Sequence, residues 1–153
     1  MADDETTDTA GEIAALDTAL AAEHAAVWGY GVVGAALPAG QRAAAVAAEN
    51  AHRDVRDQLI ALLGQRGAEP AQPEAGYALP FPILSAVDAA ALAAVLEDGV
   101  AAAWVRVLHR AVERPTRALA MDVLGAAEVR AVGWRAAAGL PQVTRAFPGL
   151  PLS

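Results

Sequence analysis

The chain contains no cysteine and no lysine, and only 5% of its residues are aromatic. Without cysteine there is no disulfide framework, no thiolate zinc site and no cysteine nucleophile, so carboxylate and imidazole groups would have to hold any metal. All 11 basic residues are arginine, and the net charge is −7. We therefore expect no nucleic-acid binding, because affinity for a phosphate backbone depends on clustered basic side chains.

Long hydrophobic runs are also missing. The longest uncharged apolar run extends from Ala25 to Leu37, which is shorter than the ~20 residues that a membrane helix needs. The first residues, MADDETTDTAGE, are acidic, whereas a secretory signal begins with basic residues and continues with an apolar stretch. The sequence thus predicts no membrane association and a cytoplasmic location.

Alanine is the most abundant residue. Hydrophobic residues make up 56% of the 153 residues, and alanine alone supplies more than a quarter of the chain. Alanine is the best helix former, and this length suits one domain. We therefore predict a disordered acidic tail at residues 1–8, followed by a single all-α domain at residues 9–153.

Four helices are predicted from apolar residues that recur every three to four positions. Thr9 and Glu12 have the spacing of a capping box, which marks the start of the first helix. Ser85 and Asp88 repeat that spacing at the start of the third helix. Pro115 suits the first turn of the fourth, where its missing N–H costs nothing. The predicted helices cover about 9–37, 41–66, 85–113 and 115–139.

The connections predict the topology. Short links within the first and the last pair of helices indicate two antiparallel hairpins. The 19-residue segment 67–85 is proline-rich and spans up to ~60 Å when extended, whereas the second helix is only ~39 Å long. The segment can therefore return along the whole bundle before the third helix starts. Two hairpins with one long crossover form the ferritin-like four-helix bundle. From about residue 140 we predict a tail whose Phe147, Leu150 and Leu152 dock on the bundle.

Several phrases of the chain occur together in a known family. In order, they are LAAEHAAVWGYGVVGA, AHRDVRDQLIALL, YALPFPI and FPGLP. With this order and spacing the chain resembles an uncharacterised actinobacterial family with a ferritin-like bundle, catalogued as a domain of unknown function. The resemblance covers about residues 10–151, and YALPFP is its most specific element. It implies the fold and no particular activity.

The superfamily resemblance suggests where a metal would bind. Di-iron members of the ferritin-like superfamily place one glutamate on each of two helices and a Glu-x-x-His pair on each of the other two. The candidate ligands for iron or another divalent metal in this chain are Glu23, Glu49, His52, Glu97 and Glu128. The sixth position, three residues after Glu128, is Ala131. The predicted site is therefore incomplete.

Helix register separates these candidates. Counted from the first interhelical turn, Glu23 and Glu49 are offset by ~9 Å along antiparallel helices, whereas Glu23 and His52 are offset by only ~4.5 Å. His52 is therefore the better partner for Glu23, and Glu49 can face either the core or water. Glu97 and Glu128 lie at similar distances from the second turn, which is compatible with their facing each other.

Two hypotheses remain open at this point. In the first, the bundle binds a metal at the incomplete carboxylate and histidine site. In the second, the bundle has lost its metal, a buried Glu23 is hydrogen-bonded to His24, His52 or an arginine, and the protein acts as a homodimer or a partner-binding module. Trp28, Tyr30, Trp104 and Trp134 are interpreted as core residues under both hypotheses.

Overall fold

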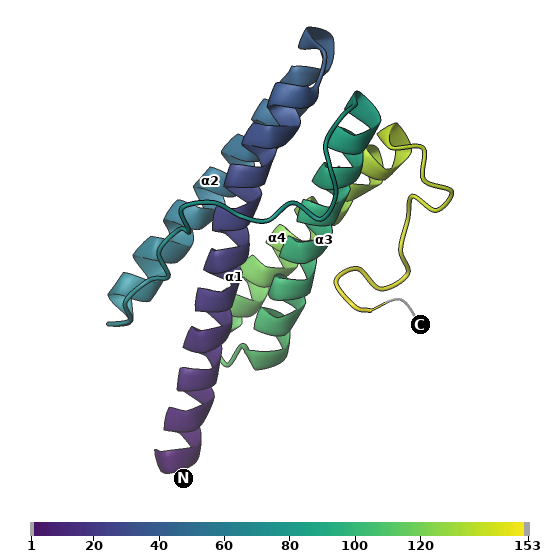
Figure 1. Ribbon diagram of the computed structural model, residues 1–153. Coiled ribbons are helices and arrows are strands. Elements are labelled where there is room, and N and C mark those ends of the chain that lie inside the picture. The colour runs from purple at the N-terminus through teal and green to yellow at the C-terminus, as the bar shows by residue number, and fades with distance from the viewer. Residues whose placement is uncertain (1, 152–153) are drawn as a thin grey trace.

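The computed structural model describes residues 2–151, with side chains from residue 8 onward, and this range contains helices but no strand (Figure 1). Its elements are α1 (Ala2–Ala36), the short 3-10 helix η1 (Ala39–Gln41), α2 (Arg42–Gln65), α3 (Ala86–Arg110) and α4 (Arg114–Ala137). The prediction of an all-α, four-helix fold is confirmed.

The helices form two hairpins, α1 with α2 and α3 with α4 (Figure 1). Helix α1 packs along both α2 and α3, and α3 packs along α4. Within the described residues, α2 and α4 have no packing of comparable extent. The bundle is therefore open on the side between α2 and α4.

The crossover between α2 and α3 contains no helix and passes over α1, as Figure 1 shows. The backbone N–H of Ala71 donates to Asp17 Oδ1 at 2.7 Å, and the carbonyl of Ala71 accepts from His24 Nε2 at 3.0 Å. Further along, the ring of Tyr77 lies 5.6 Å from that of Trp28. The long crossover predicted from the sequence is therefore present, and side chains of α1 hold it in place.

Of the two helix starts predicted from capping boxes, one is confirmed and one is wrong. Ser85 is the N-cap of α3, and its Oγ accepts from the backbone N–H of Asp88 at 3.1 Å, which confirms that capping box. The predicted start at Thr9 was wrong, because α1 begins at Ala2. Residues 2–8, predicted as a disordered tail, are part of α1, and Met1 lies outside the described residues.

The core consists mainly of leucine, alanine and the larger aromatic residues. The three- to four-residue periodicity of the second helix predicts an apolar side that contains Val46, Leu59 and Leu63. Leu59 and Leu63 of α2 are fully buried, whereas Val46 is 52% exposed, so the prediction was wrong for Val46. Gly29 of α1 lets α3 approach closely, since a Cβ there would lie 2.6 Å from Leu96 Cδ1.

The C-terminal tail runs back along α3. Gly149 has a φ of +78°, and a Cβ at this position would lie 2.5 Å from the carbonyl oxygen of Ala101, so only glycine fits. Phe147 is 72% exposed and Leu150 48% exposed, so the prediction that these side chains dock was wrong. Leu152 lies outside the described residues. No helix in residues 2–151 is long and apolar enough to cross a membrane.

Candidate functional site

Three of the predicted ligands meet in the centre of the bundle. The ring of His52 on α2 lies between two carboxyl groups, with Nδ1 2.6 Å from Glu23 Oε2 on α1 and Nε2 3.2 Å from Glu97 Oε1 on α3. All three residues are at most 1% exposed. Since burial of an unpaired charge is very costly, each of these groups needs a partner of opposite charge.

Three further side chains donate to the two carboxyl groups. Trp104 Nε1 donates to Glu23 Oε1 at 2.8 Å. Arg130 of α4 binds Glu97 through two atoms, with Nε 2.7 Å from Oε1 and Nη2 3.0 Å from Oε2. The hydroxyl of Tyr30 also donates to Glu97 Oε1. We refer to this cluster as the core network; its members are Glu23, Tyr30, His52, Glu97, Trp104 and Arg130.

The hydrogen bonds determine the charge of the core network. Burial alone would lower the pKa of His52, but its hydrogen bonds to Glu23 and Glu97 outweigh burial and raise that pKa. Burial would raise the pKa of Glu97, yet His52 and Arg130 outweigh it and lower that pKa. Both nitrogens of His52 face carboxyl oxygens, an arrangement that favours a proton on each nitrogen and therefore an imidazolium ring. The core network then contains two cationic side chains, His52 and Arg130.

Tyr30 keeps its proton in this environment. Burial, followed by the charge of Glu97, raises the pKa of the Tyr30 phenol far above its ordinary value. The ring of Tyr30 is stacked on that of His52 with 5.4 Å between centroids. The hydroxyl therefore stays protonated and acts as a donor to Glu97.

Two predicted ligands lie outside the core network. Glu49 pairs with Arg53 four residues later on α2, at the protein surface. Glu128 accepts from Arg135 Nη1 at 2.8 Å. Arg135 also donates to Asp98, so Glu128 is associated with Asp98 through a shared arginine and not with Glu97.

The core network fits a bound metal poorly. Both oxygens of Glu97 accept from the guanidinium of Arg130, and both nitrogens of His52 are engaged by carboxylates. A histidine ligand has to present a deprotonated nitrogen to the metal. In the described part of the chain, no three or more histidine, aspartate or glutamate side chains are arranged as a metal-binding group. To bind Glu97, a divalent ion would have to displace Arg130 from its two oxygens.

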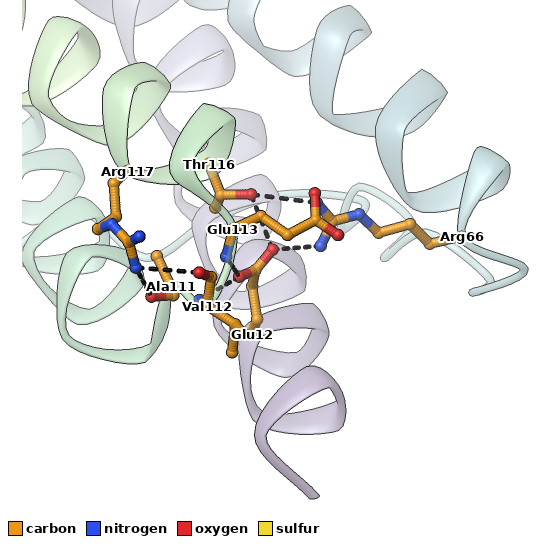
Figure 2. Close-up of polar contacts among 7 residues, drawn as sticks. All are labelled: Glu12, Arg66, Ala111, Val112, Glu113, Thr116 and Arg117. Carbon is orange, nitrogen blue, oxygen red and sulfur yellow. Dashed lines mark hydrogen bonds and ion pairs between the residues drawn. The ribbon is translucent and has the colours of Figure 1, made fainter. Parts of the chain in front are cut away.

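Glu12 forms a second buried cluster, which sequence reasoning missed (Figure 2). Its Oε1 accepts from Arg66 Nη1 and from the hydroxyl of Thr116, the latter at 2.7 Å. Its Oε2 accepts from the backbone N–H groups of Val112 and Glu113, the latter at 2.9 Å. The carboxylate thus links α1 to the end of α2 and to the turn between α3 and α4.

The charge of Glu12 is stabilised by these donors. Burial would raise its pKa, but the hydrogen bond from Arg66, together with those from the turn and Thr116, lowers it. Glu12 is 1% exposed. The burial of Glu12 could have been inferred from its position four residues before the fully buried Leu16, on the same face of the helix. The spacing from Thr9 favoured a capping interpretation instead.

A third cluster holds the C-terminal tail. Arg135 of α4 is 1% exposed and donates through Nη2 to Asp98 at 2.6 Å and through Nη1 to the carbonyl of Val143 at 2.8 Å. Arg145 of the tail pairs with the other oxygen of Asp98 at 2.9 Å. Arg135 Nε is buried and has no hydrogen-bond partner among the described residues. Glu128, predicted as a metal ligand, therefore belongs to the anchor of the tail.

Comparisons with known proteins agree with this fold. The crystal structure of a conserved hypothetical protein, rv2844, from Mycobacterium tuberculosis is similar with a TM-score of 0.83 and 38% sequence identity. The match covers 92% of this chain and 99% of that one. No curated protein matches the chain. A family profile described as Domain of unknown function (DUF4439) matches residues 15–152, and the chain belongs to that family.

Proposed function

We propose that the protein is a non-catalytic four-helix bundle that acts by associating with another protein chain. The observation that carries this proposal is the pairing of Arg130 with both oxygens of Glu97. This pairing supplies a cation from the protein itself at the place where a ferritin-like protein would hold a metal. The two hairpins and the long crossover support ferritin-like ancestry, and the similar mycobacterial protein supports an actinobacterial origin.

Under this proposal the core network serves to hold the four helices together. It joins all four helices, because Glu23, His52, Glu97 and Arg130 come from α1, α2, α3 and α4 respectively. A buried polar network is stable only when its members are satisfied, and it then specifies one arrangement of the helices. We propose that this network keeps α2 in register with α4, with which it has little packing of its own.

The surface that supports association lies on α4 and the tail. Val129 is 75% exposed, Met121 59% and the neighbouring Phe147 72%. A mainly apolar hollow of about 400 Å³ is lined by Met121 and Val129 of α4 and by Pro148 of the tail. Contiguous apolar surfaces of this kind on soluble proteins mark interaction sites. We call this region the α4–tail surface; its lining residues include Met121, Leu124, Gly125, Val129, Val132 and Pro148.

We propose self-association through the α4–tail surface, which a mass measurement in solution tests. The expected result is a homodimer by analytical ultracentrifugation that Val129→Glu converts to a monomer, because a charge would be buried in the interface. Val46→Glu is the matched control, since Val46 is also exposed but lies on α2. A wild-type monomer at ~0.5 mM, where even a weak dimer forms, contradicts the proposal.

Metal binding is the second candidate. The observation in its favour is the convergence of Glu23, His52 and Glu97 from three helices, since carboxylates and imidazoles are ligands for iron and other divalent metals. Metal analysis of protein purified without added metal and then loaded with iron(II) separates the two candidates. Stoichiometric metal that is lost in both Glu23→Ala and His52→Ala supports this second candidate, and its absence from the loaded wild type refutes it.

A further inference from the structure

The open side of the bundle contains a cleft that shares Val129 alone with the lining of the α4–tail surface. It has a volume of about 730 Å³ and lies between the start of α2 and the second half of α4. Sites for small organic ligands in proteins measure ~300–1,000 Å³. The cleft is therefore large enough for a small molecule.

Small residues on both walls keep this cleft open. Gly133 on α4 and Gly40 before α2 face it, and a Cβ built on either would meet no atom within 4 Å. Ala44 and Ala48 complete the wall formed by α2. A Cβ at Gly133 or Gly40 would therefore enter open space, so packing against neighbouring atoms does not require glycine at either position.

The inner wall of the cleft combines one cation with one aromatic ring. Arg130 lines it, and its Nε and Nη2 are held by Glu97. Within the described residues no hydrogen bond of its Nη1 is seen, this nitrogen is not one of the buried unpartnered atoms, and the Arg130 side chain is 22% exposed. Trp134 lines the same wall and is 9% exposed, while its other side packs 6.1 Å from the ring of Tyr30.

These groups are held in position before any ligand arrives. The two bonds to Glu97 fix the plane of the Arg130 guanidinium, and the surrounding core fixes Trp134. A preorganised guanidinium loses little conformational entropy when it binds an oxyanion. We infer that the cleft binds a small molecule with a flat apolar body and an anionic oxygen group, the anion on Arg130 Nη1 and the body along Trp134.

The test uses 1-naphthoate as the probe and calorimetry as the measurement, with 1-naphthylmethanol as its uncharged counterpart. The expected result is binding of 1-naphthoate at least ~10-fold tighter than that of the alcohol, since the carboxylate adds a charge-assisted hydrogen bond. Amide NMR shifts on binding should be largest for Gly133 and Gly40. Equal binding of the two compounds, or no binding of 1-naphthoate at ~5 mM, overturns the inference.

Three glycine variants locate the probe. Gly133→Leu fills the cleft and should weaken binding of 1-naphthoate at least ~10-fold. Gly31→Leu is the matched control, because Gly31 is an exposed helical glycine with open space around its Cβ and lies outside the cleft. Unchanged binding in Gly133→Leu overturns the inference. So does a loss confined to Gly125→Leu, which would place the probe on the α4–tail surface.

Discussion

Replacement of Glu12 by glutamine should destabilise the protein strongly, because the carboxylate accepts four hydrogen bonds. Oε1 accepts from Arg66 and Thr116, and Oε2 accepts from the backbone N–H groups of Val112 and Glu113. Glutamine has one acceptor oxygen and one NH2 group. With the NH2 group on the Oε2 side, the backbone N–H groups of Val112 and Glu113 both lose their acceptor. With the NH2 group on the Oε1 side, the Thr116 hydroxyl can turn and accept from it, so Arg66 Nη1 alone loses its acceptor and faces another donor.

The magnitude follows from the less costly orientation, in which Arg66 Nη1 loses both its acceptor and the negative charge that it pairs with. An unsatisfied buried donor costs ~1–3 kcal/mol, and a broken buried ion pair costs ~3–5 kcal/mol. Arg66 is 14% exposed and can recover part of this through water. We therefore expect a loss of ~3 kcal/mol in the free energy of unfolding, within the range measured for broken buried ion pairs.

Urea unfolding measures this loss. With a slope of ~2 kcal/mol per molar urea, ~3 kcal/mol lowers the midpoint by ~1.5 M while the slope stays constant. Glu49→Gln is the matched control, because Glu49 forms a surface pair with Arg53 and should cost less than ~0.5 kcal/mol. If Glu12→Gln costs less than ~1 kcal/mol, or no more than Glu49→Gln, the reasoning from hydrogen-bond satisfaction is refuted.

Three further predictions concern pH, the tail and the core network. The pKa of Glu97 is lowered from 4.5, so its stabilisation is present above pH 4.5 and is lost as the pH falls through the native pKa. The pKa of His52 is raised from 6.5, so its stabilisation is complete below pH 6.5 and is lost as the pH rises through the native pKa. Urea unfolding of wild type and His52→Gln should therefore differ most between pH 4.5 and 6.5; a larger difference at pH 9 would contradict the charge assigned to His52. Gly149→Ala should displace the end of the tail beyond its anchors at Val143 and Arg145, with faster amide exchange at Leu150 and a melting temperature close to that of wild type; unchanged exchange would contradict the close approach to Ala101. Arg130→Met removes the two hydrogen bonds of the guanidinium to Glu97 and leaves His52 as its remaining cation. It should cost ~3 kcal/mol in urea unfolding, and a cost below ~1 kcal/mol would contradict the structural role of the pair.

Local sequence signals predicted the helices and their connections well. The spacing of Ser85 and Asp88, the proline in the first turn of α4 and the proline-rich crossover all act over a few residues, so the sequence carries their structural consequence directly. Helix register also predicted correctly that His52 and not Glu49 meets Glu23, because distance along an α-helix follows from residue number.

Long-range polar partners could not be predicted in the same way. Arg130 binds Glu97 from another helix, and Glu12 reaches a turn about 100 residues further along the chain. Nothing in the local pattern around an acidic residue shows whether its partner is an arginine, a backbone N–H or a metal. The capping spacing of Thr9 was misleading for the same reason, since Glu12 serves donors far away in the sequence and not the start of its own helix.

The ring nitrogens of His52 test the central claim most directly, because the core network needs both of them protonated. Nitrogen-15 NMR of the three histidines at pH 7, with a His52→Gln sample for assignment, reports the protonation state of each ring. The structure predicts an imidazolium at His52 whose signals do not change when EDTA or iron(II) is added. A neutral ring, with one nitrogen that responds to the metal, would contradict the claim that an ion-pair network occupies the core.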